Sequence, residues 1–225
     1  MEFDNFIAYF FRWMHLFAGV AWVGLLYYFN FVQTDYFKVA SSDAKASAIS
    51  QLVPRALKWF RFAALGTFLT GLALAGFLGN AVNFYLTLGM LLGTLMFLNV
   101  WIIIWPNQKI IIASNEQVLN GGAPLPEAAT AQANAALSSR TNTLFSLPML
   151  FFMGASSHLD GIGRVPMAMD GSVGPVAAGT CIVLIALLEL NSIRGKMGPM
   201  ASVVGVVHCG IALAIALLLI IQFLS

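Results

Sequence analysis

The sequence predicts an all-α integral membrane protein, a bundle of about six transmembrane helices with short interfacial helices in its cytoplasmic loops. Hydrophobic residues make up 60% of the 225 residues and charged residues only 9%, well below the roughly 25% of soluble domains. The apolar residues gather in long runs, and a spanning helix needs about 20 of them. The net charge of +2 is small and scattered, so nucleic acid is not an expected partner.

Six apolar stretches account for the whole chain, which we interpret as one membrane domain covering residues 1–225. The expected spans are 7–32, 59–79, 82–105, 142–160, 174–191 and 201–224. Two polar segments, 33–58 and 106–140, are expected on the cytoplasmic surface with short helices of their own. The second contains the turn Asn120-Gly121-Gly122 and an alanine-rich stretch that begins near Pro126, a favourable first-turn position for a helix.

The lysines and arginines predict how the chain is oriented. Most of them follow the first, third and fifth spans, whereas the opposite side holds only Arg12 and Arg164. Because cytoplasmic loops are enriched in Lys and Arg, we expect both termini on the periplasmic side of a bacterial inner membrane. The N-terminal apolar run lacks a basic leader and a small-residue cleavage site, and is therefore expected to be a retained span of a multi-pass protein.

Three histidines, His15, His158 and His208, lie within or at the edge of apolar runs. An imidazole in hydrocarbon costs free energy unless it is hydrogen-bonded or bound to a metal, and imidazole is an axial ligand of haem iron. At about 1.5 Å per residue, His15 lies roughly 12 Å below the outer surface and His208 roughly 12 Å above the inner one. Depth favours the pair His15 and His208 as iron ligands, with His158 as the alternative, and the pairing stays open.

Small residues lie one helical turn from each histidine. Ala18 and Gly19 follow His15, and similar residues flank the other two. They leave flat space for a porphyrin, but they are also what close helix packing requires. Gly89 and Gly93, with no histidine nearby, form a GxxxG motif that predicts packing. Arg12, three residues before His15, is expected to bind a haem propionate or to extend to the lipid headgroups.

Polar and aromatic residues gather where three spans meet the cytoplasmic face. Arginine and carboxamide side chains suit a flat, polar, anionic heterocycle, and tryptophan can stack on it. The alternative is that they are ordinary interfacial anchors. The candidate substrate-binding residues are Arg61, Asn99, Trp105, Asn107, Arg140 and Asn142.

Four stretches, 15–33, 54–71, 99–109 and 139–158, resemble the membrane domain of bacterial membrane-bound urate hydroxylases, the urate oxidase N-terminal domain family. The motifs Trp-Pro-Asn-Gln-Lys at 105–109 and Ser-Arg-Thr-Asn-Thr at 139–143 are the specific part of the likeness. The resemblance implies a b-type haem held by histidines, a purine-like substrate such as urate on the cytoplasmic side, and electron transfer to an external cytochrome c.

The chain departs from that family pattern because no CxxCH motif occurs in it. The family's membrane domain is typically followed by a cytochrome c domain, so the resemblance here implies a separate cytochrome c partner. The alternative function is a non-catalytic or electron-relaying subunit of a larger respiratory membrane complex. Whether the chain is itself an oxidoreductase stays open at this point, and lipid is an expected partner in either case.

Overall fold

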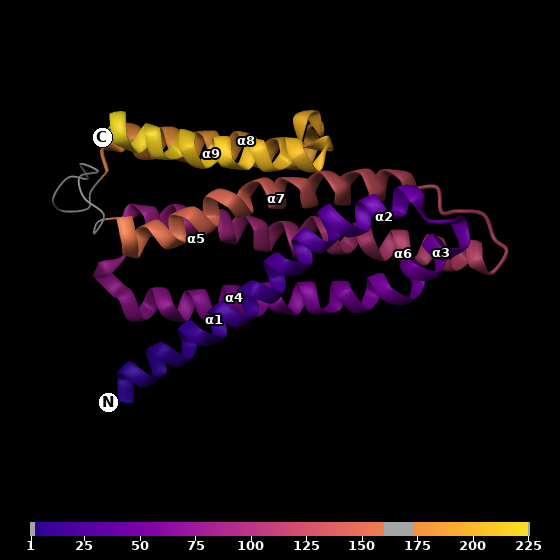
Figure 1. Ribbon diagram of the computed structural model, residues 1–225, viewed down its shortest axis with the longest axis horizontal. Coiled ribbons are helices and arrows are strands. Elements are labelled where there is room, and N and C mark those ends of the chain that lie inside the picture. Colours follow the sequence, from indigo (N-terminus) through magenta and orange to yellow (C-terminus); the bar gives the residue numbers. More distant parts are fainter. Residues whose placement is uncertain (1–2, 160–172, 225) are drawn as a thin grey trace. The chain divides into compact units, whose positions relative to one another are not determined.

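The computed structural model describes residues 3–159 and 173–224, and all regular structure in these ranges is helical, which confirms the all-α fold class (Figure 1). Arg164 lies outside the described residues. The longer helices are α1 (Phe3–Tyr27), α4 (Val53–Leu78), α5 (Phe84–Leu98), α6 (Trp105–Leu119), α7 (Ala128–His158), α8 (Pro175–Arg194) and α9 (Val203–Leu224). The shorter ones are α2 (Thr34–Val39), α3 (Ser42–Ser47), the π-helical turns η1 (Tyr28–Gln33), η2 (Ala48–Leu52) and η4 (Asn99–Ile104), and the 3-10 turns η3 (Gly79–Ala81) and η6 (Gly198–Ala201).

Five helical stretches among the described residues are long and apolar enough to cross a membrane. They are Asn5–Val39, Ser42–Ala81, Phe84–Leu119, Pro175–Arg194 and Val203–Leu224, and each covers all or nearly all of one predicted span, so five of the six predicted spans are matched. The remaining predicted span, 142–160, falls almost entirely in the second half of α7. It is not among the five candidates, because polar residues interrupt its apolar ones and lower its mean hydropathy; they include Asn142, Thr143 and Ser146.

The first three spans continue as helices well beyond the thickness of a bilayer. The stretch Ser42–Ala81 has 40 residues, which at 1.5 Å per residue is about 60 Å, twice the ~30 Å hydrocarbon core. The segments expected to hold separate interfacial helices are therefore largely continuations of the spans. The physical reason is that no proline or glycine interrupts residues 25–39 or 107–119, and Pro106 lies in the first turn of α6, where proline is tolerated. The turn at 120–122 is confirmed, with Gly121 at φ 84°.

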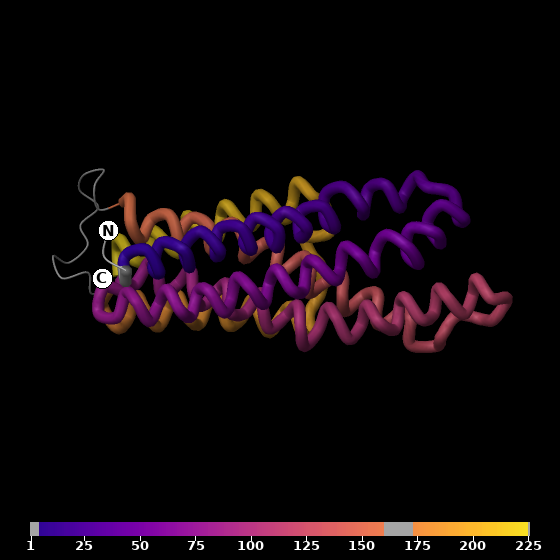
Figure 2. Tube along the Cα trace, turned by 90° about the horizontal axis from the view of Figure 1, so that it is seen from below, coloured from indigo at the N-terminus to yellow at the C-terminus, as the bar shows by residue number. Residues whose placement is uncertain are grey.

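The chain forms two compact units, the first made of residues 1–74 and 97–139 and the second of residues 75–96 and 140–225. In the first unit, the helices that extend past the spans are tied by side chain to backbone bonds. Asn115 of α6 donates to the carbonyl of Ala46 in α3 at 3.1 Å, and Leu125 N donates to Ser114 Oγ at 3.0 Å. Figure 2 shows the chain doubling back from α2 to α4 through the short turn between α2 and α3.

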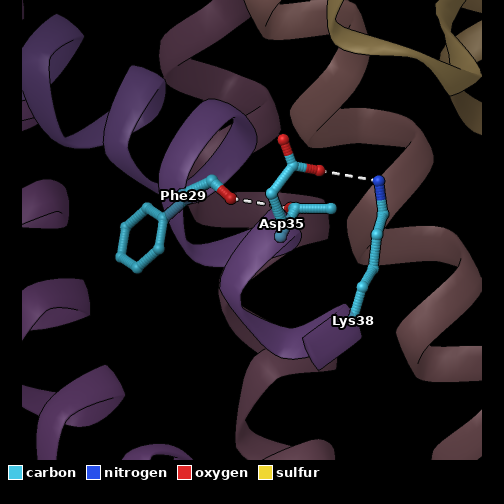
Figure 3. Close-up of polar contacts among 4 residues, drawn as sticks. Phe29, Asp35 and Lys38 are labelled. Carbon is cyan, nitrogen blue, oxygen red and sulfur yellow. Dashed lines mark hydrogen bonds and ion pairs between the residues drawn. The ribbon is translucent and has the colours of Figure 1, made fainter. Parts of the chain in front are cut away.

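The π-helical turn η1 places an amide inside the first unit. Asn30 is buried and donates to Leu26 O at 2.9 Å and to Ser139 Oγ of α7 at 2.8 Å. The wide turn is stabilised at its end, where Thr34 Oγ1 donates to the Phe29 carbonyl at 2.8 Å. Figure 3 shows that carbonyl together with the ion pair of Asp35 and Lys38 that follows it.

Glycines on α5 and α9 allow close packing within the second unit. A Cβ at Gly89 would lie 3.0 Å from Met153 Cγ, and one at Gly93 would lie 3.9 Å from Met149 Cγ, so α5 packs on α7 through these glycines as the GxxxG motif predicts. On α9, a Cβ at Gly210 would collide with Leu147 of α7. The contact of Met153 with Gly89 and that of Leu147 with Gly210 are both possible because glycine has no side chain.

The contact at Gly210 predicts a stability effect. Replacing Gly210→Ala adds a methyl group that would overlap Leu147 and lie 3.0 Å from the backbone carbonyl of Leu144. We expect a loss of about 1–3 kcal/mol, the usual cost of overpacking, measured as a lower unfolding midpoint by circular dichroism in detergent. Gly179→Ala, at an exposed position of α8 where no atom of the described residues lies within 4 Å of the added methyl group, is the matched control and should not destabilise. Equal stability of the two variants would contradict the packing.

Candidate functional site

His15 lies half-buried on α1 against α4, and two hydrogen-bonding groups of α4 hold its ring. Nδ1 is 2.9 Å from the Thr67 carbonyl oxygen and 3.1 Å from Thr70 Oγ1. A carbonyl oxygen only accepts, so Nδ1 carries the proton and donates it. The Thr70 hydroxyl donates to Gly66 O at 2.6 Å and can therefore accept from His15. Nε2 is then the unprotonated nitrogen, with its lone pair available to a ligand.

Small residues bring α1 and α4 close enough for these bonds. A Cβ at Gly71 would lie 3.1 Å from His15 Cε1, so the imidazole ring occupies the space that a side chain at this position would fill. Nearby, a Cβ at Gly66 would lie 3.4 Å from the Cβ of Ala18. The small residues after His15 in the sequence are thus used, at least in part, for helix packing.

His208 and His158 both lie in the second unit and both are exposed. His208 Nδ1 is 2.7 Å from the Val204 carbonyl oxygen of its own helix. The same reasoning makes Nδ1 a protonated nitrogen, so in the neutral imidazole the lone pair is on Nε2. Among the described residues, neither His15 nor His208 has a hydrogen bond to Nε2.

The second unit fixes how far apart its two histidines are. Leu147 of α7 lies level with Gly210 of α9, and an apolar groove continues along both helices in the same direction. The groove is lined by Leu147, Phe151, Ile211, Ala214, Ile215 and Leu218. His158 is eleven residues beyond Leu147, and His208 is two before Gly210. At 1.5 Å per residue they are about 20 Å apart along the helices, too far for two imidazoles to share one iron.

Arg12 lies on α1, three residues before His15, and is exposed. Residues three apart lie on the same helical face, so Arg12 follows the face that carries His15. The exposure suits both of its expected roles, binding a propionate or extending to the headgroups.

Polar residues in the middle of α7 are buried on every side of the helix. Every residue from Arg140 to Ser146 is buried, and the Arg140 side chain is only 6% exposed. The Asn142 amide donates to the carbonyl of Met96 at 2.9 Å. A fully buried run of this polarity in an apolar chain is unusual, because each group must be hydrogen-bonded to offset its desolvation.

Two of the six predicted substrate-binding residues, Arg61 and Trp105, are in direct contact. The Arg61 guanidinium carbon lies 3.3 Å from the centre of the Trp105 ring, in the first unit. Lys109, one turn further along α6, places Nζ 5.7 Å from the same ring. Asn107 instead donates to Ile103 O of its own helical run at 2.8 Å.

The structure adds residues that the sequence interpretation did not single out. They are Asn30, which is buried in η1, and Thr67 and Thr70, which contact His15. Asn99, the remaining predicted residue, is buried at the start of η4. A carboxamide inside the first apolar run was a visible signal for Asn30. Thr67 and Thr70 gave no such signal, because threonine is common in transmembrane helices and bonds its own backbone.

Comparison with known proteins supports the resemblance over the central part of the chain. The family described as urate oxidase N-terminal matches residues 77–164. The matched segment includes the Trp-Pro-Asn-Gln-Lys and Ser-Arg-Thr-Asn-Thr motifs, so the resemblance to this family is confirmed there. No curated protein and no solved structure matches the chain.

The bonds of His15 predict its tautomer. We expect the Nδ1-protonated form, which is measurable by nitrogen-15 NMR of histidine-labelled protein in nanodiscs. Gly71→Leu should displace the ring and abolish this form, whereas Thr70→Val should retain it, because the Thr67 carbonyl still accepts. A wild-type spectrum dominated by the Nε2-protonated tautomer would contradict the assignment.

Proposed function

We propose that this membrane protein is a b-type haem protein that passes electrons from a purine-like anion, such as urate, on the cytoplasmic side to an external cytochrome c. The observation that carries the proposal is the bond from His15 Nδ1 to a backbone carbonyl. A histidine that ligates a metal usually donates its other ring N–H to a carbonyl or carboxylate, which orients the ring and raises its basicity. His15 therefore fits the donor set of haem iron.

His15 is the ligand we assign first. His158 and His208 are too far apart within their unit to bind one iron together, so a bis-histidine pair requires His15. His208 has the same tautomer, which supports it as the second ligand over His158. Arg12, on the face of α1 that carries His15, is proposed to bind a propionate by a charge-assisted hydrogen bond. When bound, haem supplies one-electron chemistry, while these residues hold and orient it.

Arg140 is the residue we propose to bind the anionic substrate. It lies in the Ser-Arg-Thr-Asn-Thr motif, inside the segment that matches the urate oxidase N-terminal family. The Arg140 side chain is buried, with only 6% exposed, and a guanidinium is suited to bind a planar anion through two parallel hydrogen bonds. Because a cytochrome c accepts one electron at a time, two transfers to it are needed for each two-electron oxidation of a purine, in which water would supply the added oxygen atom and two protons would be released.

Haem binding is tested by a reduced-minus-oxidised spectrum and a pyridine haemochrome assay of the purified protein. We expect a b-type α-band, its loss or shift in His15→Ala, and an altered spectrum in His208→Ala. His158→Ala should keep the wild-type spectrum. A protein purified with haem available that shows no α-band and no iron would overturn the proposal. Haem without any urate oxidation would instead favour the electron-relaying subunit.

Substrate binding is tested separately on Arg140. We expect Arg140→Gln to weaken urate binding by about 10- to 100-fold, the usual effect of removing charged hydrogen bonds, measured by equilibrium dialysis in detergent. Arg140→Lys should recover part of the loss. Arg194→Gln, an exposed arginine of α8 in the same unit, is the control and should bind normally. Unchanged binding by a folded Arg140→Gln protein would remove Arg140 from the site.

A further inference from the structure

Arg61, Trp105 and Lys109 form what we term the interfacial cation cluster, in the first unit. The Arg61 guanidinium carbon is 3.3 Å from the Trp105 ring centre and 5.8 Å from that of Trp101, and Lys109 Nζ is 5.7 Å from the Trp105 ring. Stacking on an indole stabilises each cation. Because Arg61 and Lys109 both lie against the Trp105 ring, their two positive charges are also close together and repel each other.

No carboxylate among the described residues neutralises the cluster. Arg61 donates through Nε to Leu57 O at 3.3 Å, and neither Arg61 nor Lys109 forms an ion pair in residues 3–159 and 173–224. The terminal guanidinium nitrogens of Arg61 and the ammonium of Lys109 are therefore available to an anion. Next to them, Trp101 Nε1 is buried, and it has no hydrogen-bond partner among the described residues.

The position of the cluster indicates which anion this is. Arg61 and Trp105 lie at the cytoplasmic ends of the predicted spans 59–79 and 82–105, where tryptophan and basic side chains meet lipid headgroups. Towards the middle of the same two spans the surface is apolar. Phe62 is 52% exposed, Leu69 is 54% exposed and Ile102 is 65% exposed. Phe62 also packs edge-on against Trp101 at 6.3 Å.

We propose that this surface is a binding site for an anionic glycerophospholipid. The phosphate binds Arg61 and Lys109, and the acyl chains lie along the exposed apolar side chains of the two spans. A free phosphate would use only the cationic part and would leave the adjacent apolar surface unexplained. The inference is independent of haem and of the proposed substrate site at Arg140.

Native mass spectrometry of delipidated protein, titrated with phosphatidylglycerol or phosphatidylcholine, tests the site. We expect phosphatidylglycerol to bind in preference, with its affinity reduced about tenfold in Arg61→Gln or Lys109→Gln, since each variant removes charged hydrogen bonds to phosphate. Lys109 is exposed, so its variant should fold even if Arg61→Gln does not. Arg55→Gln, an exposed arginine of α4 that bonds the Gln51 carbonyl, is the matched control and should bind normally.

Four results would overturn the proposal. Equal binding of the two lipids, or an equal loss in Arg55→Gln, would show that charge at this position does not select the lipid. Displacement of phosphatidylglycerol by inorganic phosphate at millimolar concentration would identify a site for a free anion. Displacement by urate would return Arg61 and Trp105 to the substrate site that the sequence predicts.

Discussion

The hydrogen bonding of polar groups in an apolar environment is the constraint on which this structure depends. Within hydrocarbon there is no water to replace a missing partner, so a polar side chain on a span is stabilised when it bonds to protein. Here the partners are mainly helix carbonyls. His15 bonds Thr67 O, and Asn142 bonds Met96 O on the neighbouring helix. These bonds determine which faces of neighbouring helices pack together, and they thereby fix the positions of the candidate site residues His15 and Asn142.

Bonds between helices demand a close approach, and small residues make that approach feasible. The contact of His15 with α4 occurs where Gly66 and Gly71 face α1, and the packing of α5 on α7 occurs at Gly89 and Gly93. A side chain at Gly71 or Gly89 would press on the residue that faces it, with an added Cβ only 3.1 Å from His15 Cε1 or 3.0 Å from Met153 Cγ. The polar and the small residues of this sequence therefore act together, and neither set explains the packing without the other.

The sequence predicts those parts of the structure that depend on the order of apolar, polar and turn-forming residues along the chain. Apolar runs predict all five candidate membrane-crossing stretches of the described residues, and Asn120-Gly121-Gly122 predicts the turn between α6 and α7. The structure of the polar segments after the first and third spans was harder to predict. Their polarity indicates exposure to water, but polar residues do not end a helix, so the helices continue into them. The partner of His15 could not be predicted at all. It is a backbone carbonyl, present at every residue, and only the crossing of two helices selects which one.

A backbone carbonyl has a physical advantage over a carboxylate as the partner of a histidine inside a span. It fixes the ring without adding a net charge, whereas a buried carboxylate would carry a desolvation cost of several kcal/mol. The Thr67 carbonyl has two lone pairs, one for the helical N–H of Gly71, four residues ahead, and one for His15. The residue at position 71, whose N–H bonds the Thr67 carbonyl, also lies beside the His15 ring, so a side chain at this position would crowd the imidazole. Glycine at position 71 therefore allows both bonds to form on one oxygen.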